Sequence, residues 1–513
     1  MRHLSILLLI VMLSSFSSLP LKKDNSLLTV KEVVTESGII SGISGIDSVV
    51  KIFKGVPFAA PPVGNLRWKP PVKASSWTGI RKCDEFAASA IQNPPVPFAM
   101  WTKEFMAPVA PISEDCLYLN VWTAARFAAE KRPVIVWIHG GAFTGGSGSV
   151  PLYDGETMAK KGVVFITINY RLGIFGFLAH PELSAESDKK VSGNYGILDQ
   201  IAALEWVKRN VAAFGGDPGK VTIAGQSAGA FSVNALMVSP LAKGLFHRAI
   251  AQSGGMLSGN LVRNQPLADA EKLGEKIAAQ VNAKSIKELR MKPAEELLKA
   301  GGRWSITTDG IVVPHAYSTY AAGKQNDVPL LTGWNGDDGV SFGEPPTAKS
   351  FIANAQNQYK EKAAAFLKVF PATTDEEAKT TAKLASQLSF GFLNYRWALM
   401  QSKTGKNKAY LYYFTRVPPG EPNYGAFHSA EFGYALGTLA LWNRPWQPWD
   451  HQLSDMMTSY WVNFATTGNP NSAGLPLWPE FNGENPQVIL FGDKVNAEKL
   501  PYQQQLEVLD LLN

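Results

Sequence analysis

The sequence predicts an α/β fold in which a large, mostly parallel central sheet is flanked by helices. Two buried runs of strand type, around Val134–Ile138 and Val221–Ile223, each lead directly into a glycine-rich loop. An amphipathic helix from Ile197 to Phe214 precedes the second run, and a helical run from Ala228 to Val238 follows it. Buried strands that alternate with helices in this way indicate βα units of one sheet.

Length and composition are those of a globular protein with a large core. The chain has 513 residues, which by length alone would suggest several domains. The motifs that matter run from Lys51 to Asn471 as parts of one sheet, so we expect a single domain over residues 26–513. The net charge of +6 is mild over this length, and no basic cluster is dense enough to predict a nucleic-acid partner.

The N-terminus predicts a secretory signal peptide over residues 1–18. A basic start is followed by the apolar run Leu4–Leu13 and then by small residues, with cleavage expected between Ser15 and Leu21. The apolar run is too short to span a bilayer, and no cysteine follows it for lipid attachment. We therefore expect an exported protein without a stable membrane anchor. The chain holds no Asn-x-Ser/Thr site, which favours a bacterial periplasm or exterior.

The second glycine-rich loop reads Gly225-Gln226-Ser227-Ala228-Gly229. Gly-x-Ser-x-Gly between a strand and a helix is the pattern of a nucleophile elbow, in which a sharp turn lifts the serine hydroxyl out of the sheet. The glycines are needed because the turn leaves no room for side chains beside the serine. Ser227 is thus the candidate nucleophile, and an ordinary glycine-serine turn is the alternative.

The first loop reads His139-Gly140-Gly141-Ala142 and directly follows its strand. Small residues allow backbone N–H groups to approach a negatively charged oxygen closely. A loop of this kind accompanies the nucleophile elbow in lipases and esterases. The alternative is a glycine-rich hairpin without a catalytic role.

Taken together, these motifs make the sequence similar to the type-B carboxylesterases, of the carboxylesterase/cholinesterase family within the α/β-hydrolase fold. The bacterial p-nitrobenzyl-esterase-like branch resembles it most, since that branch also has alanine at the third loop position. The resemblance implies that the N–H groups of Gly141, Ala142 and Ala228 form the oxyanion hole. It extends over nearly the whole mature chain, through segments at residues 53–59, 114–120, 169–173, 193–196 and 460–464.

The catalytic base is sought among the histidines that follow the nucleophile, because this fold has the chain order serine, acid, histidine. His247 opens the next strand, His315 leaves little room for an acid before it, and His451 lies at a helix start. His428 lies on a loop after the predicted strand Ala409–Thr415. The family places its base at the same point, so we predict His428.

The acid is expected after another strand, Pro329–Gly333, where the family has Asp-Glu-Gly with the glutamate in the triad. Asp338 stands in the glutamate position and is one methylene shorter, so the loop must shift or His428 must lie closer. Asp337 is a rival, with a turn cap as its alternative role. Glu431 is a second rival, although its position three residues after His428 favours an anchoring role.

The cysteines of the chain are Cys83 and Cys116. Two cysteines in an exported protein most simply pair, and the resemblance implies a disulfide that closes a loop beside the active site. On the chain-entropy description such a bridge would stabilise by about 3–4 kcal/mol. The alternative is two buried free thiols.

Helical periodicity over Ala268–Ala300 and Lys349–Lys403 predicts insertions that cover the pocket and shape its entrance. The family commonly has glutamate before the nucleophile, and Gln226 removes that negative charge here. We therefore expect neutral esters to be preferred over choline esters. No stretch resembles an interfacially activated lid, which favours short to medium acyl chains.

These observations predict a serine carboxylic-ester hydrolase that acts on small to medium neutral esters through an acyl-enzyme. No metal and no organic cofactor is needed for this chemistry. The alternatives are a non-catalytic cholinesterase-like binding protein, and an amidase or lipase on the same triad, since acyl-transfer chemistry is shared. The sequence leaves the natural substrate and the oligomeric state open.

Overall fold

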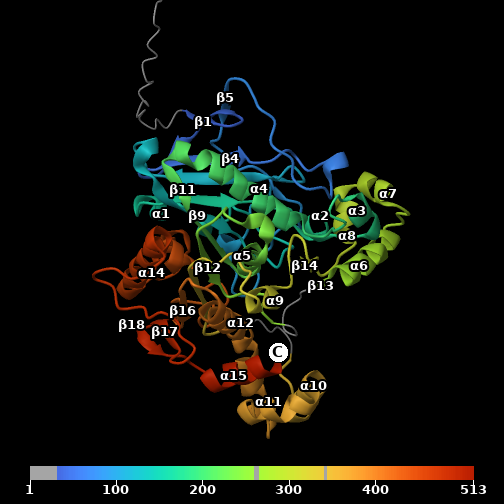
Figure 1. Ribbon diagram of the computed structural model, residues 1–513. Coiled ribbons are helices and arrows are strands. Elements are labelled where there is room, and N and C mark those ends of the chain that lie inside the picture. The colour runs from blue at the N-terminus through green and yellow to red at the C-terminus, as the bar shows by residue number, and fades with distance from the viewer. Residues whose placement is uncertain (1–31, 259–264, 340–343) are drawn as a thin grey trace, which may run out of the picture.

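The structure, a computed structural model, describes residues 32–258, 265–339 and 344–513 (Figure 1). The predicted signal peptide lies outside the described residues. Within them, the main sheet has eleven strands. In spatial order these are β18 (Val495–Lys499), β17 (Gln487–Phe491), β16 (Ala409–Phe414), β15 (Leu330–Asn335), β12 (Arg248–Gln252), β11 (Gly216–Gln226), β9 (Arg132–Ile138), β10 (Val164–Ile168), β8 (Tyr118–Thr123), β4 (Lys51–Pro57) and β3 (Ile43–Ser44).

The centre of this sheet is parallel, and its two edges are antiparallel. The pairings from β17 through to β10 all run parallel, whereas β18 and the group β8, β4 and β3 pair in the antiparallel sense. The predicted fold class, an α/β-hydrolase fold with a mostly parallel sheet, is confirmed. Central strands are fully buried, as β10 and β15 show, because helices cover both faces.

Alternate residues of one strand show how the two faces are covered. Val134, Val136 and Ile138 of β9 point into one core cluster together with residues of helices α4 (Tyr195–Asn210) and α5 (Ala228–Val238). Ile135 and Trp137 point into a second cluster on the opposite face, together with α14 (Pro448–Thr467). Ser227 directly follows β11 and precedes α5, so it lies at the carboxyl edge of the sheet.

The strands between residues 33 and 57 belong to two different sheets. β1 (Val33–Thr35) and β2 (Gly38–Ser41) pair with β5 (Ile80–Lys82) in a separate three-stranded sheet, and β3 and β4 alone join the main sheet. Two further small sheets pair β6 (Ser89–Ala90) with β7 (Ile112–Ser113) and β13 (Gln265–Pro266) with β14 (Thr307–Thr308).

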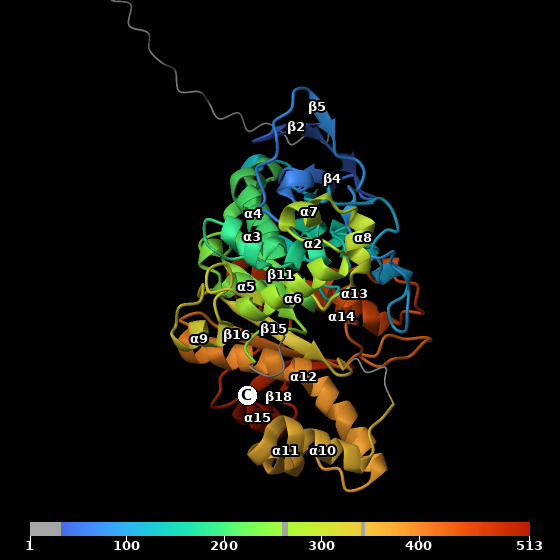
Figure 2. The same cartoon turned by 90° about the vertical axis from the view of Figure 1, so that its right-hand side faces the viewer.

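Both predicted helical insertions are present. The first contains α6 (Leu267–Gln280), α7 (Ile286–Met291) and α8 (Ala294–Lys299), and the second contains α10 (Ala348–Tyr359), α11 (Ala363–Val369) and the long α12 (Asp375–Thr404). Figure 2 shows α10 and α11 grouped with α15 (Gln503–Leu512) beyond α12, at the end of the molecule away from β5. The shorter helices are α1 (Glu156–Lys160), α2 (Gly173–Phe177), α3 (Pro181–Glu186), α9 (Ala316–Ala321) and α13 (Phe432–Leu436).

Short 3-10 helices complete the described elements. They are η1 (Gly64–Leu66), η2 (Lys103–Phe105), η3 (Ala128–Glu130), η4 (Pro151–Tyr153), η5 (Val211–Phe214), η6 (Pro240–Ala242), η7 (Lys360–Lys362) and η8 (Leu439–Leu441). Among the described residues, no helix combines the length and the apolar character that crossing a membrane requires.

The two cysteines are free thiols in the structure, so the predicted disulfide between Cys83 and Cys116 is not formed. The carbonyl of Cys83 accepts a hydrogen bond from the N–H of Lys54 in β4, whereas Cys116 borders a small cavity lined by Ala90 and Ile91. Burial raises the pKa of Cys83 to about 12 and that of Cys116 well above its ordinary value, so both stay protonated.

Candidate active site

Ser227 lies in the sharp turn between β11 and α5 and adopts φ 55° and ψ −123°. This strained conformation is rare for a residue with a side chain and persists only where the surroundings hold it. The N–H of Ser227 donates to the carbonyl of Gln252 in β12 at 2.9 Å, and its own carbonyl accepts from Phe231 in α5 at 3.0 Å. The turn therefore fixes a partly buried serine at the edge of the sheet, where it borders a cavity.

The two glycines of the elbow are required by close backbone packing. A Cβ on Gly229 would lie 2.0 Å from the carbonyl oxygen of Ile138, and one on Gly225 would lie 2.6 Å from the carbonyl carbon of Gly229. Neither neighbour is a flexible side chain that could move aside. This close packing is the physical reason why an elbow needs a glycine on each side of the serine.

The loop after β9 has three successive residues with positive φ, namely Gly141 (108°), Ala142 (55°) and Phe143 (61°). The carbonyl of Gly141 accepts from the N–H groups of Thr144 and Gly145. The hydrogen bonds of the described residues include none donated by the N–H of Gly141 or Ala142. These two groups remain free to receive an anionic oxygen.

Ala228 is the first residue of α5, where N–H groups have no partner within the helix and the helix dipole is positive. Gly140 lets the loop pack closely against this helix start, since a Cβ placed on it would lie 3.2 Å from Cβ of Ser227. The structure thus brings the loop that carries two of the three predicted oxyanion donors against the elbow that carries the third.

His139, in the same loop, is a structural residue. Its ring stacks on Tyr170 with centroids 4.4 Å apart, and its Nδ1 lies 2.8 Å from the carbonyl oxygen of Gly140. Burial lowers the pKa of His139 to about 4, so the ring is neutral at physiological pH.

His428 and Asp338 form a buried pair. Nδ1 of His428 lies 2.6 Å from Oδ1 of Asp338, whose other oxygen accepts the N–H of Asn335 at 3.0 Å. Asp338 is fully buried, and the shorter side chain nevertheless reaches the ring. Asp337 points elsewhere: its carboxylate accepts the N–H of Ala426 and faces Lys383 at 3.5 Å. Of the two aspartates, the structure therefore brings Asp338 to His428.

The other candidate histidines have structural partners. Nδ1 of His247 accepts the N–H of Val221, and Nδ1 of His315 accepts the N–H of Ser318 as the N-cap of α9. His451 lies exposed on α14. None of the three lines the cavity that holds Ser227 and His428.

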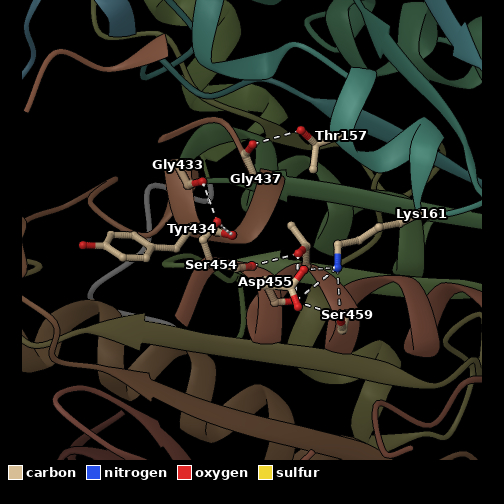
Figure 3. A network of polar contacts seen from close by, with 9 residues as sticks. Thr157, Lys161, Gly433, Tyr434, Gly437, Ser454, Asp455 and Ser459 are labelled. Carbon is tan, nitrogen blue, oxygen red and sulfur yellow. Dashed lines mark hydrogen bonds and ion pairs between the residues drawn. The ribbon is translucent and has the colours of Figure 1, made fainter. Parts of the chain in front are cut away.

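The loop that carries His428 continues into α13, and α13 is anchored on both sides (Figure 3). The hydroxyl of Ser454 in α14 donates to the carbonyl of Tyr434, and the hydroxyl of Thr157 in α1 donates to the carbonyl of Gly437. Lys161 then joins α1 to α14 through an ion pair with Asp455. These contacts fix the short helix that follows the histidine, and so limit how far its loop can move.

Glu431, the second rival acid, does not contact His428 in any hydrogen bond of the described residues. Its carboxyl accepts from the side chains of Asn335 at 2.5 Å and Gln252 at 3.0 Å. Burial, together with the nearby charge of Asp338, raises the pKa of Glu431 to about 7. Glu431 therefore anchors the loop that carries His428, as its spacing from His428 predicts. No sequence pattern pointed to Asn335 or Gln252 as its partners.

The hydrogen bond expected between the nucleophile and the base is not formed. Hydrogen bonds of the described residues include none between Ser227 Oγ and His428. Instead, Nε2 of His428 lies 3.1 Å from Nε2 of Gln226. Catalytic hydrogen bonds often become short only when substrate is bound, so both side chains remain candidates by position.

Ser227 and His428 line one cavity of about 820 Å³. Its wall is mostly aromatic and aliphatic and holds no Asp, Glu, Lys or Arg. The second helical insertion contributes Phe390 and Leu393 of α12, as predicted, whereas α6, α7 and α8 supply no lining residue. Phe390 stacks on the ring of His428 with centroids 4.7 Å apart. Such a cavity suits an uncharged organic molecule.

The comparisons agree with the geometry. The profile of the family described as Carboxylesterase family matches residues 29–509. The chain belongs to the carboxylesterase family. It is 35% identical over 481 residues to fumonisin B1 esterase of Sphingopyxis macrogoltabida, covering 90% of this chain and 86% of that protein. It is also 32% identical to cocaine esterase of Homo sapiens, covering 88% of this chain and 86% of that protein.

Among solved structures, a PNB esterase superposes with a TM-score of 0.80 at 30% identity, covering 94% of this chain and 99% of that chain. The predicted family and its resemblance to p-nitrobenzyl esterases are thus confirmed. This carboxylesterase is a carboxylic-ester hydrolase. Among the described residues, no group of three or more His, Cys, Asp or Glu is placed to hold a metal ion.

Proposed function

We propose that this carboxylesterase hydrolyses small to medium neutral esters through an acyl-enzyme on Ser227, with His428 as base and Asp338 as its orienting acid. One observation carries the proposal. The buried 2.6 Å contact between His428 and Asp338 borders the same cavity as a serine in a strained elbow. A histidine oriented by a carboxylate beside such a serine is the arrangement that activates a hydroxyl.

In this mechanism Ser227 Oγ attacks the ester carbonyl and its proton passes to Nε2 of His428. Asp338 holds the ring with Nδ1 protonated and stabilises the imidazolium. The N–H groups of Gly141, Ala142 and Ala228 receive the oxyanion, each worth about 2.7–4 kcal/mol in the transition state. Nε2–H then protonates the leaving alcohol, and water repeats the cycle on the acyl-enzyme.

Two features support a neutral substrate. The residues that line the cavity include no charged side chain, and Gln226 stands beside the nucleophile where a glutamate would add a negative charge. A quaternary ammonium would gain no carboxylate partner here, and the apolar wall favours uncharged acyl and alcohol groups.

A matched pair of substrates tests this choice. Acetylcholine and its uncharged isostere 3,3-dimethylbutyl acetate have the same shape and differ in charge. We expect kcat/KM to be higher for the neutral ester, and equal or better turnover of acetylcholine would contradict the proposal. Ser227→Ala is the control for background hydrolysis.

A second panel separates the alternative activities on the same triad. p-Nitrophenyl esters of increasing acyl length, emulsified triglycerides and p-nitroanilides report on esterase, lipase and amidase activity. We expect the highest kcat/KM on short to medium acyl chains. Peak turnover on long triglycerides or on anilides would identify the lipase or the amidase instead, and no turnover of any of them would favour a binding protein.

Export is part of the same proposal. The basic start and apolar run of residues 1–13 support a signal peptide, and the protein would then act in the periplasm or outside the cell. Mass spectrometry of the protein purified from its exported fraction tests this. A mature N-terminus between residues 16 and 22 is the expected result, and an intact Met1 in a cytoplasmic fraction would contradict it.

A further inference from the structure

The side chain of Gln226 occupies the position that the nucleophile needs on the base. It is buried beside Ser227, and its Nε2 lies 3.1 Å from Nε2 of His428. The opposite ring nitrogen, Nδ1, is held by the carboxylate of Asp338. Since that carboxylate accepts only, the proton of the neutral ring lies on Nδ1 and Nε2 is an acceptor. The amide therefore presents its N–H₂ group to the ring.

From this contact we infer that Gln226 is a positioning residue, which donates a hydrogen bond to Nε2 of His428 and holds the neutral base with that nitrogen facing the elbow. The inference rests on the proposed roles of Ser227 and His428. Before attack, Ser227 Oγ–H replaces the amide as the donor to Nε2. The hydroxyl proton moves to Nε2 as the bond from Oγ to the carbonyl carbon forms.

Once Nε2 carries the proton, the amide N–H₂ can no longer donate to it, because two donors would then face each other. The contact thus favours the neutral ring over the imidazolium. A carboxylate at this position would have the opposite effect, because it would attract the positive ring.

The surroundings of the ring make this contact easy to isolate. Asp338 faces it from the loop after β15, and Glu431 lies behind that loop at the start of α13. The other elements packed against the ring present uncharged groups: Phe390 from α12 and the edge of Trp101 from the segment after β6. Replacing Gln226 changes the group at Nε2 and leaves the other neighbours in place.

The experiment compares pH profiles of kcat/KM for p-nitrophenyl acetate in the wild type, Gln226→Glu and Gln226→Met. Glutamate keeps the shape and adds a negative charge, so the acid limb should move to higher pH by about 1–3 units. Methionine keeps the length and removes the donor, so the limb should move in the same direction by less than one unit. The readout is the position of the acid limb, whatever the rate of each variant on the alkaline plateau.

A packing role for Gln226 gives a different result. Rates would then fall by the same factor at every pH while the acid limb stays in place, and that outcome overturns the inference. Thermal melting of each variant shows whether it is folded. If Gln226→Glu does not fold, Gln226→Met decides alone, through the presence or absence of its smaller shift. A wild type without turnover would count against the proposed function, whereas an active wild type with unshifted variants counts against Gln226 alone.

Discussion

Replacing Asp338 by asparagine should nearly abolish turnover without unfolding the protein. The carboxylate is fully buried and accepts from two donors, Nδ1 of His428 at 2.6 Å and the N–H of Asn335 at 3.0 Å. An asparagine amide has one acceptor for these two donors. If its oxygen faces Asn335, its N–H₂ group faces Nδ1, and the ring must carry its proton on Nε2.

That tautomer cannot take the proton of Ser227. The expected loss is about 10⁴-fold in kcat, or roughly 5 kcal/mol of transition-state stabilisation. The opposite amide orientation places two donors together beside Asn335 and costs stability instead. Steady-state kinetics on p-nitrophenyl acetate measures the loss in kcat, and circular dichroism with thermal melting confirms the fold.

The neighbouring residue provides a matched control. Asp337→Asn removes an ion pair with Lys383, whose side chain is largely exposed, and such surface pairs contribute about 0.2–1 kcal/mol. Its oxygen can still accept the N–H of Ala426. We expect less than a threefold change in kcat. Equal losses in the two variants, or more than a tenth of wild-type kcat in Asp338→Asn, would refute the assignment of the acid.

Three further predictions concern the scaffold. Glu431 has a pKa of about 7 against an ordinary 4.5, so its contribution to stability is present below pH 4.5 and falls as the pH rises to 7. In urea denaturation, wild type should lose on the order of 3 kcal/mol over this range relative to Glu431→Gln, and parallel curves would contradict this. Because Cys83 and Cys116 are free, reductant should not change the melting temperature, and two thiols should titrate in denaturant. A melting temperature that depends on reductant would show that the disulfide forms after all. Gly229→Ala should destabilise by about 1–3 kcal/mol or more, since its Cβ would lie 2.0 Å from the carbonyl of Ile138, and an unchanged melting temperature would contradict the close packing.

Much of the fold was predictable because buried parallel strands leave a strong pattern. The helix predicted at Ala228–Val238 has the same bounds in the structure. The elbow was predictable for a similar reason, since backbone packing at Gly225 and Gly229 excludes any larger residue.

Other features depend on contacts between distant segments, which a single sequence does not show. β1 and β2 pair with β5, about forty residues later, and so leave the main sheet. The number of cysteines and the expected export favoured a disulfide, whereas Cys83 and Cys116 are buried free thiols in the structure. Likewise, the short Asp338 was a departure in sequence, and the distance to His428 shows that it nevertheless reaches the ring.

The side chain of Gln226 illustrates the same limit within the site. Its type was visible in the sequence, where it indicated the loss of a charge beside the nucleophile. Its contact with Nε2 of His428 depends on the way a loop more than two hundred positions away folds back on the elbow. The sequence gives the chemical groups of the site, and the fold decides which of them meet.

Covalent labelling of Ser227 tests the central claim most directly. The purified protein is treated with a fluorophosphonate, digested and analysed by tandem mass spectrometry, with Ser227→Ala as the control. We predict a single phosphonylated serine, at residue 227, with loss of esterase activity in proportion to labelling. Full labelling at another residue, or an alanine variant that keeps wild-type turnover, would contradict the account.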